Sequence, residues 1–238
     1  MEWYPQDKKE LSKVIDKFLE QKLELKQKQI NGLIVPHAGY SFSGEIVGKA
    51  YALLKEQKPK IAIILAPSHY LPLSGIASHN QPNWQTSLGN IDIIDNNFHK
   101  IDISKEHAID NQVPFLQKLG FKKILPLVIG EITREQAKEI ASEISKIEAI
   151  IIVSTDLSHF LPYNEAVKKD KETIKAIENL DSEKLSKIEN SACGIYPLKI
   201  IVELCKIKNW MPKLIEYKNS GDITGDKSSV VGYASFCF

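Results

Sequence analysis

The chain has 238 residues, of which 43% are hydrophobic and 26% are charged, so it is long enough to bury one sizeable core as a single domain over 1–238. Its 31 basic and 30 acidic residues give a formal net charge of +1, which excludes a strong global attraction to nucleic acid or to an anionic membrane. The N-terminus shows no apolar signal segment, and the longest apolar runs are about seven residues, too short to cross a bilayer, so we expect a cytoplasmic protein.

The predicted elements alternate between helix and strand along the chain. Thr133, followed three residues later by Gln136, forms a capping-box pattern at the start of one helix. Ser43 is expected to cap a second helix, and Gly120 to end a third. In chain order we expect a helix over 7–26 as part of an N-terminal extension (1–29), a strand over 30–35, a helix over 43–57, a strand over 60–66, a helix over 105–119, a strand over 123–129, a helix over 133–146, a strand over 149–154, helices over 163–178, 181–189 and 195–207, and strands over 213–217 and 229–237.

This order predicts the fold class. Strands that alternate with helices of roughly 10–15 residues are typical of βαβ units. The strands over 60–66 and 149–154 each contain a continuous apolar run, over 61–66 and 149–153, as expected for parallel strands covered on both faces. We therefore expect an α/β fold with three layers: a mainly parallel central sheet, helices on both faces, and an antiparallel edge formed by the C-terminal strands. The stretch 78–93 is expected to be a loop.

Chemically capable residues follow three of the predicted strands. His37 follows one strand, His69 follows the next, and Asp156 and His159 follow a third. A single histidine after a strand is more often structural, but histidines at equivalent positions in one sheet indicate a site beyond the carboxyl ends of its strands. His107 lies at a predicted helix start, and its position alone does not decide between the two interpretations.

The remaining histidines and the three cysteines have separate interpretations. His79 and His99 fall in predicted loops and are expected to be solvated. The wide cysteine spacing and the lack of a C-x-x-C motif argue against a disulfide framework or a zinc ribbon. Cys205 and Cys237 lie in apolar stretches and are expected in the core. Cys193 stands at the entrance to a predicted helix, where the helix N-terminus favours a thiolate, as a metal ligand or a nucleophile requires.

Six short motifs occur in one order: VPHAGYSFSG, LAPSHY, EHAIDNQVPFL, LPLVIG, STDLSHF and CGIYPL. Together they resemble the Memo family, which is similar in fold to the class III extradiol dioxygenases. The resemblance runs from about residue 30 to the last strand and is weak over 1–29. It implies a class III extradiol-dioxygenase-like fold.

The resemblance implies a metal site in which Cys193 joins His37 and His69 as ligands. Nitrogen and sulfur donors suit transition metals better than magnesium or calcium, and we expect iron or copper, with zinc also compatible. The dioxygenases of this fold hold iron with two histidines and a carboxylate. A thiolate in place of the carboxylate changes the redox behaviour of the iron, so the fold alone does not predict ring cleavage.

Other residues are implied to line the same pocket. His159 is a candidate general acid or base, Asp156 is a candidate for orienting an imidazole, and His107 matches a family histidine near them. Aromatic side chains flank these residues and either pack the pocket or contact a substrate. The candidates for substrate contact are Tyr40, Tyr70 and Tyr196.

Three functions remain open. The first is a metal-dependent redox enzyme acting on an unknown substrate; bacterial and archaeal relatives occur with a radical-SAM protein, which suggests partner proteins of that system. The second is an adaptor that binds a peptide or phospho-ligand in the same pocket without catalysis, as the animal relatives imply. The third is a hydrolase in which Cys193 attacks, His159 is the base and Asp156 orients it. No G-x-G-x-x-G motif supports a dinucleotide site.

Overall fold

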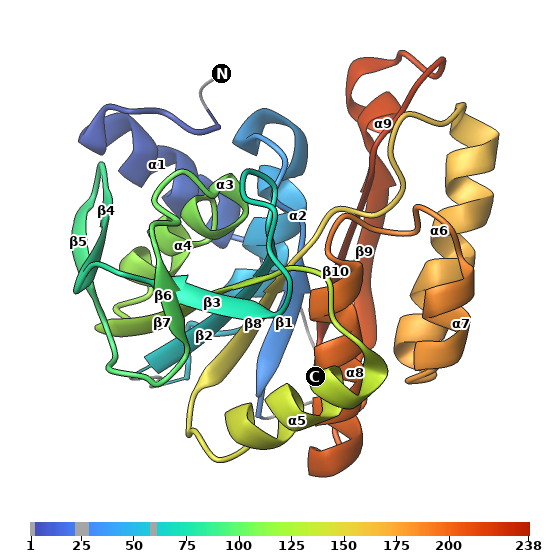
Figure 1. Ribbon diagram of the computed structural model, residues 1–238. Helices are drawn as coiled ribbons and strands as arrows, with labels where there is room; N and C mark the ends of the chain where they lie inside the picture. The colour runs from blue at the N-terminus through green and yellow to red at the C-terminus, as the bar shows by residue number, and fades with distance from the viewer. Residues whose placement is uncertain (1–2, 22–28, 58–60) are drawn as a thin grey trace.

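The computed structural model describes residues 3–21, 29–57 and 61–238, and within them the chain forms one ten-stranded sheet (Figure 1). Eight strands follow one another in the order β4-β5-β7-β2-β8-β1-β10-β9, while β3 pairs with both β7 and β6. The strands are β1 (Gly32–Val35), β2 (Ile61–Pro67), β3 (Ile76–His79), β4 (Asn83–Thr86), β5 (Gly89–Ile93), β6 (His99–Ile101), β7 (Lys123–Ile129), β8 (Ile150–Ser154), β9 (Lys213–Asn219) and β10 (Gly232–Cys237).

The centre of the sheet is parallel. Strand β8 lies between β1 and β2 and is parallel to both, and β7 is parallel to β2 on its other side. At the opposite edge, β10 is antiparallel to β1 and β9 is antiparallel to β10. Both the mainly parallel sheet and the antiparallel C-terminal edge are therefore confirmed. Because β1, β2 and β8 run in one direction, their carboxyl ends meet at the same edge of the sheet.

Helices cover both faces of this sheet, which confirms the three-layer α/β fold (Figure 1). Side chains alternate along β2, so that Ala62 and Ile64 pack into the core beneath α1–α4, whereas Ile63 and Leu65 pack into the core beneath α5–α8. The helices are α1 (Lys8–Leu19), α2 (Tyr40–Ala52), α3 (His107–Asp110), α4 (Val113–Lys118), α5 (Arg134–Ile144), α6 (Tyr163–Glu178), α7 (Ser182–Lys187), α8 (Ile195–Lys208) and α9 (Ser220–Thr224).

Several helix boundaries differ from the prediction. The capping box at Thr133 is present, but Ser43 is not a cap, because α2 begins at Tyr40 and the Ser43 hydroxyl donates to the carbonyl of Ala38 at 2.8 Å. The expected helix over 105–119 is two helices, α3 and α4, and Pro114 stands in the first turn of α4, where a missing N–H costs little. Helix α1 ends at Leu19, and the predicted residues 22–26 lie outside the described segments.

The stretch 78–93 is not a loop, since it contains the end of β3 and all of β4 and β5. These strands are short, and β4 and β5 form an antiparallel hairpin that pairs with β7 at the edge of the sheet. Edge strands bury few side chains, so their sequence lacks the apolar run that marks the central strands. The sequence pattern therefore revealed the turn residues of the hairpin but not its strands.

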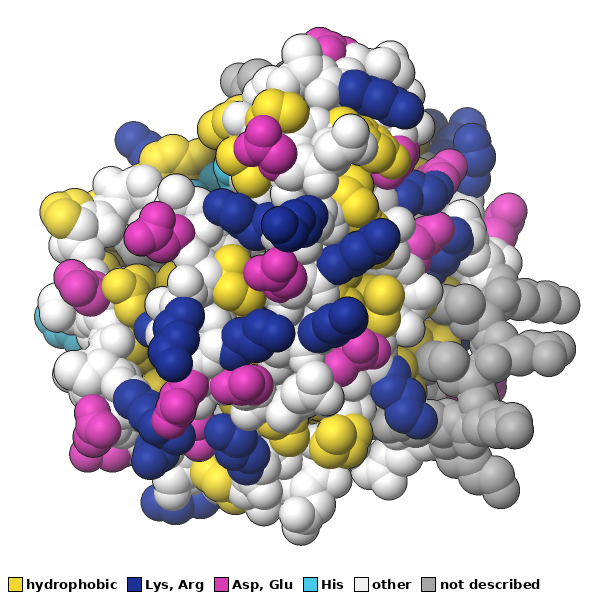
Figure 2. Space-filling model, turned by 90° about the vertical axis from the view of Figure 1, so that its right-hand side faces the viewer, with side chains coloured by type: hydrophobic (Ala, Val, Ile, Leu, Met, Phe, Trp, Pro, Cys, Tyr) yellow, Lys and Arg dark blue, Asp and Glu magenta, His cyan; other side chains and the backbone are white. Residues whose placement is uncertain are grey.

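The surface around α6 mixes both signs of charge. Lys168, Lys171 and Lys175 are exposed along this helix together with Glu172, and Figure 2 shows lysine and acidic side chains interleaved over this face. Opposite charges at such spacing screen one another, so the surface resembles a solvated helix face rather than a concentrated basic patch. In the described segments, no helix combines the length and the apolar character needed to cross a membrane.

Candidate metal centre

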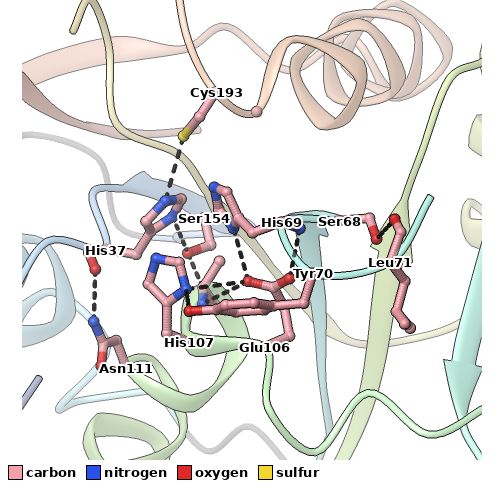
Figure 3. Close-up of polar contacts among 12 residues, drawn as sticks. His37, Ser68, His69, Tyr70, Leu71, Glu106, His107, Asn111, Ser154 and Cys193 are labelled. Atoms are coloured by element: carbon pink, nitrogen blue, oxygen red, sulfur yellow. Dashed lines mark hydrogen bonds and ion pairs between the residues drawn. The ribbon is translucent and has the colours of Figure 1, made fainter. Parts of the chain in front are cut away.

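Three histidines meet beyond the carboxyl ends of β1 and β2 (Figure 3). One nitrogen from each of His37, His69 and His107 lies within 4.8 Å of the other two. The ring centroids are 5.1 Å apart for His37 and His69, and 4.6 Å apart for His69 and His107. The first two histidines follow strands directly, whereas His107 comes from the start of α3. This group of imidazoles could hold a metal ion.

Ser154 fixes the orientation and the tautomer of the His37 ring, which is buried. The Ser154 hydroxyl donates its single hydrogen to the carbonyl of Ala108, 2.6 Å away, and accepts a hydrogen bond from Gln112 Nε2 at 3.0 Å. Because the hydroxyl has no second hydrogen, its 3.1 Å contact with His37 Nδ1 places the imidazole proton on Nδ1. His37 Nε2 therefore keeps a lone pair, which is available to a metal ion.

Two of the three imidazoles are held in the neutral form. Burial, followed by the charges of His69 and His159, keeps the pKa of His37 well below its usual value of 6.5. Burial and the two neighbouring histidines lower the pKa of His107 to about 3. Neutral imidazoles have the lone pairs that metal ions bind, so protons compete little for these two groups near pH 7.

Cys193 contacts the cluster through His37 but is not in the group whose ligand atoms all lie within 4.8 Å of one another, where His107 stands with His37 and His69 instead. Its Sγ is 3.3 Å from His37 Nε2 and accepts a hydrogen bond from the backbone N–H of Asp156, also at 3.3 Å. Gly194 permits this approach, because a Cβ there would lie 2.6 Å from the Thr155 side chain. Burial, and then the Asp156 carboxylate, raise the pKa of the Cys193 thiol to about 12. The expected preference for thiolate is therefore wrong for the protein alone, since desolvation outweighs the helix N-terminus.

Asp156 holds the backbone of His37 rather than an imidazole ring. Its Oδ1 accepts a hydrogen bond from the His37 N–H at 2.8 Å, and burial raises the pKa of this carboxyl to about 6. The His159 ring is half-buried and stands edge-on to Phe160 with centroids 5.7 Å apart. The charge of His159 contributes to the pKa of both His37 and Asp156, so it lies at the same rim of the sheet.

Two amides that we did not single out from the sequence complete the support of His37. Asn111 Nδ2 donates to the carbonyl of His37 at 2.6 Å, and Gln112 Nε2 donates to the carbonyl of Pro36 at 2.9 Å. Both side chains are buried. They belong to the motif EHAIDNQVPFL, and adjacent amides in an otherwise apolar helical stretch were the signal that could have identified them.

A sequence model of the family described as "Memo-like protein" matches residues 2–237 of the chain. The chain belongs to the Memo family. It is similar to a "MEMO1 family protein" of Aquifex aeolicus, with 32% identity over 99% of this chain and 96% of the relative. The corresponding protein of Methanobrevibacter smithii is 35% identical over 99% and 96%, and that of Sulfurisphaera tokodaii is 36% identical over 86% and 81%.

The Memo family match also includes the N-terminal residues, where the motifs alone indicated little resemblance. This segment forms part of the site. The Trp3 ring stacks on the His107 ring with centroids 4.1 Å apart and an interplanar angle of 12°, and the Trp3 carbonyl accepts a hydrogen bond from Tyr40 N at 2.9 Å. The next residue, Tyr4, donates its hydroxyl hydrogen to Asp110 Oδ2 at 2.6 Å. Trp3 and Tyr4 are therefore held against α3, where the Trp3 ring covers one face of His107.

Replacing Tyr4 with phenylalanine is expected to destabilise this Memo-family chain by about 1–3 kcal/mol, because a largely buried carboxylate, Asp110, loses a donor. Urea denaturation measures the change in the free energy of unfolding. The matched control is Tyr163→Phe, which removes an exposed hydroxyl bond to Asp222 and should cost less than about 0.5 kcal/mol. Equal effects of the two changes would contradict a fastening role for Tyr4.

The three tyrosines expected around the pocket occupy different environments. Tyr40 is buried, and its hydroxyl donates to the carbonyl of Asn111, so its ring packs the core. Tyr70 is 52% exposed, and its hydroxyl lies 3.0 Å from His107 Nδ1. Tyr196 is half-buried in the first turn of α8. Of these three, Tyr70 has the exposed aromatic surface that contact with a substrate needs.

The residues expected outside the site are mostly where we placed them. Cys205 and Cys237 are fully buried, as predicted, and all three cysteines are free. His99 is exposed, also as predicted, but it lies in β6 rather than in a loop. The prediction for His79 was wrong: it is buried in β3 and its Nδ1 accepts a hydrogen bond from Ile103 N at 3.3 Å.

Proposed function

We propose that this chain binds a transition metal ion, iron or copper, in the histidine cluster and carries out metal-dependent redox chemistry on a small substrate. The observation that supports the proposal most directly is the convergence of His37, His69 and His107, with one nitrogen from each inside 4.8 Å. Histidines with a purely structural role have no reason to cluster, because neighbouring protonated imidazoles repel one another. A shared metal ion would explain why these three face one another.

The donor set fits such an ion. His37 has a lone pair on Nε2, which faces the Cys193 sulfur at 3.3 Å, and burial keeps His37 and His107 neutral. Imidazole nitrogens suit zinc, copper, iron and nickel, and a thiolate would shift the preference toward softer ions. We keep His37, His69 and Cys193 as the predicted ligands and treat His107 as the competing third ligand, since Cys193 Sγ is 3.3 Å from His37 Nε2.

A bound iron or copper ion would supply electron transfer or activation of oxygen at this position. The residues of the chain would then position the substrate and move protons. His159, at the rim, is the proposed proton carrier, and Tyr70 presents an exposed ring and a hydroxyl beside His107. Asp156 keeps the His37 loop against the end of β8 through the backbone N–H.

Metal reconstitution tests the proposal. The purified chain would be loaded with iron(II) or copper without oxygen, freed of loose metal, and measured by elemental analysis. We expect about one equivalent per chain, and a bound ion that can be reduced and reoxidised. A content below about a tenth of an equivalent for iron, copper and zinc alike would refute it.

The adaptor function stays the alternative, and one observation favours it. Phe160 is 76% exposed and adopts a positive φ of 57°, and Tyr70, beside His107, is 52% exposed. Exposed aromatic rings at a strained rim are typical of surfaces that contact a ligand. Peptide binding that survives both metal removal and the change Cys193→Ser would support this alternative over redox chemistry.

The hydrolase function has less support. It requires an activated Cys193 thiolate beside His159, but the sulfur contacts His37, and burial raises its pKa to about 12. A nucleophilic cysteine needs the opposite shift. The Asp156 carboxylate is also bound to the backbone of His37 rather than to an imidazole.

A further inference from the structure

Glu106 is a buried carboxylate beside the histidine cluster (Figure 3). Its Oε2 accepts a hydrogen bond from the backbone N–H of His69 at 2.8 Å, and its Oε1 lies 2.8 Å from His69 Nδ1. The same Oε1 accepts a hydrogen bond from Ala108 N at 3.1 Å and lies 3.4 Å from His107 Nδ1. One side chain therefore contacts two of the three imidazoles.

Helix capping explains only part of this arrangement. Glu106 is the N-cap of α3, and the bond from Ala108 N fulfils that role with a single oxygen. The bonds to His69 connect Glu106 to the segment that follows β2, 37 residues away in the chain. In the described segments, the basic side chains that form ion pairs with Glu106 are His69 and His107. Burying a carboxylate costs free energy unless well-placed partners compensate it, and the two imidazoles provide that compensation for Glu106.

The contacts set the protonation pattern of His69. A carboxylate that receives two backbone N–H groups is an acceptor, so the contact with His69 Nδ1 requires the imidazole proton on that nitrogen. The lone pair of His69 is then on Nε2. A carboxylate behind an imidazole also makes the remaining nitrogen a stronger ligand. Ser154 holds His37 in the same tautomer. Ser154 and Glu106 therefore each leave the Nε2 lone pair of one histidine available for a metal ion.

We propose that Glu106 is a positioning residue that holds His69 as the Nδ1–H tautomer and aims its Nε2 at the metal ion. The part concerning the ion rests on the proposed function, whereas the tautomer follows from the contacts of Glu106 alone. Glu106 acts through His69, because His107 Nδ1 is closer to the Tyr70 hydroxyl, at 3.0 Å, than to Glu106 Oε1, at 3.4 Å.

Two variants of Glu106 and one control separate this role from helix capping. Glu106→Gln replaces one acceptor oxygen with an amide donor, which cannot accept from an N–H. Glu106→Asp keeps the charge and a good capping side chain but is one methylene too short to keep both bonds to His69. The control is Glu203→Gln, the same change at a buried glutamate that accepts hydrogen bonds from Ser182 and Lys206 at 3.1 Å.

The first measurement uses the protein without added metal. Nitrogen NMR of histidine-labelled chain reports which ring nitrogen of His69 carries the proton. We expect the Nδ1–H form in the wild type and in Glu203→Gln, and an Nε2–H form or a mixture in both Glu106 variants. His37 is the internal reference, because Ser154 holds it independently. Glutamine keeps one oxygen that can still accept from His69 Nδ1, so an unchanged His69 tautomer in both Glu106 variants would refute the proposal.

The second measurement is metal affinity by competition with a chelator. We expect both Glu106 variants to bind about 10–100-fold more weakly than the wild type, and Glu203→Gln to bind normally. Equal affinities for Glu106→Gln and Glu203→Gln would overturn the metal-directed half of the inference. If the wild type binds no metal, the proposed function fails, and the NMR result still decides whether Glu106 sets the tautomer.

Discussion

Replacing His37 with glutamine is expected to weaken metal binding by at least about 100-fold, which exceeds the usual effect of losing a residue that only supports a ligand. His37 belongs to the histidine cluster and is also the imidazole that Cys193 contacts, so it is required by either ligand set. Glutamine nearly preserves the volume and can still pair with the Ser154 hydroxyl, so the loss should reflect the missing nitrogen ligand.

The chain offers a matched control for this experiment. His79 is also a buried histidine, but its Nδ1 accepts a hydrogen bond from Ile103 N and it lies outside the cluster. His79→Gln should leave the metal affinity unchanged while causing a comparable loss of stability. A chelator competition would measure both variants. If His37→Gln and His79→Gln bound the metal equally well, the ion would have to be held elsewhere.

Two of the three imidazoles of the site, those of His37 and His69, could be predicted because each follows a recognisable strand, whereas His107 begins α3 and was indicated only by the family resemblance. His37 and His69 each stand two residues after the last residue of an apolar strand, and the carboxyl ends of parallel strands converge in space. The supporting groups could not be found in this way. Glu106 and Ser154 act on side chains 37 and 117 residues away in the chain, and nothing local distinguishes them from a helix cap and a strand end.

The fold shows a similar contrast between elements with a clear local sequence pattern and elements without one. The central strands were predictable because burial on both faces gives continuous apolar runs. The hairpin β4–β5 was missed because, of its residues, only Trp84 and Ile91 are buried. The contribution of Trp3 was missed for another reason. Its stacking on His107 is a contact between residues far apart in the chain, which a local sequence pattern does not reveal. Local patterns identify elements, whereas packing decides which distant residues join a site.

The pH dependence of the metal affinity is expected to identify the third ligand, because a thiol must release a proton when it binds the metal. The pKa of the Cys193 thiol is raised to about 12, so the sulfur is protonated at pH 7.5–9 and must lose its proton to become a ligand. His37 and His107 have lowered pKa values, in the case of His107 about 3, so they are already neutral in this range. Coordination by Cys193 should therefore make the affinity rise about tenfold per pH unit, whereas coordination by imidazoles alone should leave it flat.

We expect the rising profile, with the sulfur as ligand, and two variants check its origin. Cys193→Ser should weaken binding and abolish the slope, because a hydroxyl keeps its proton in this range. His107→Gln should keep the slope, since the thiol is still present. The measurement is a chelator competition between pH 7.5 and 9, corrected for the chelator's own protonation. A flat profile in the wild type would assign the third position to His107, whose ring the N-terminal Trp3 already holds in place beside His69.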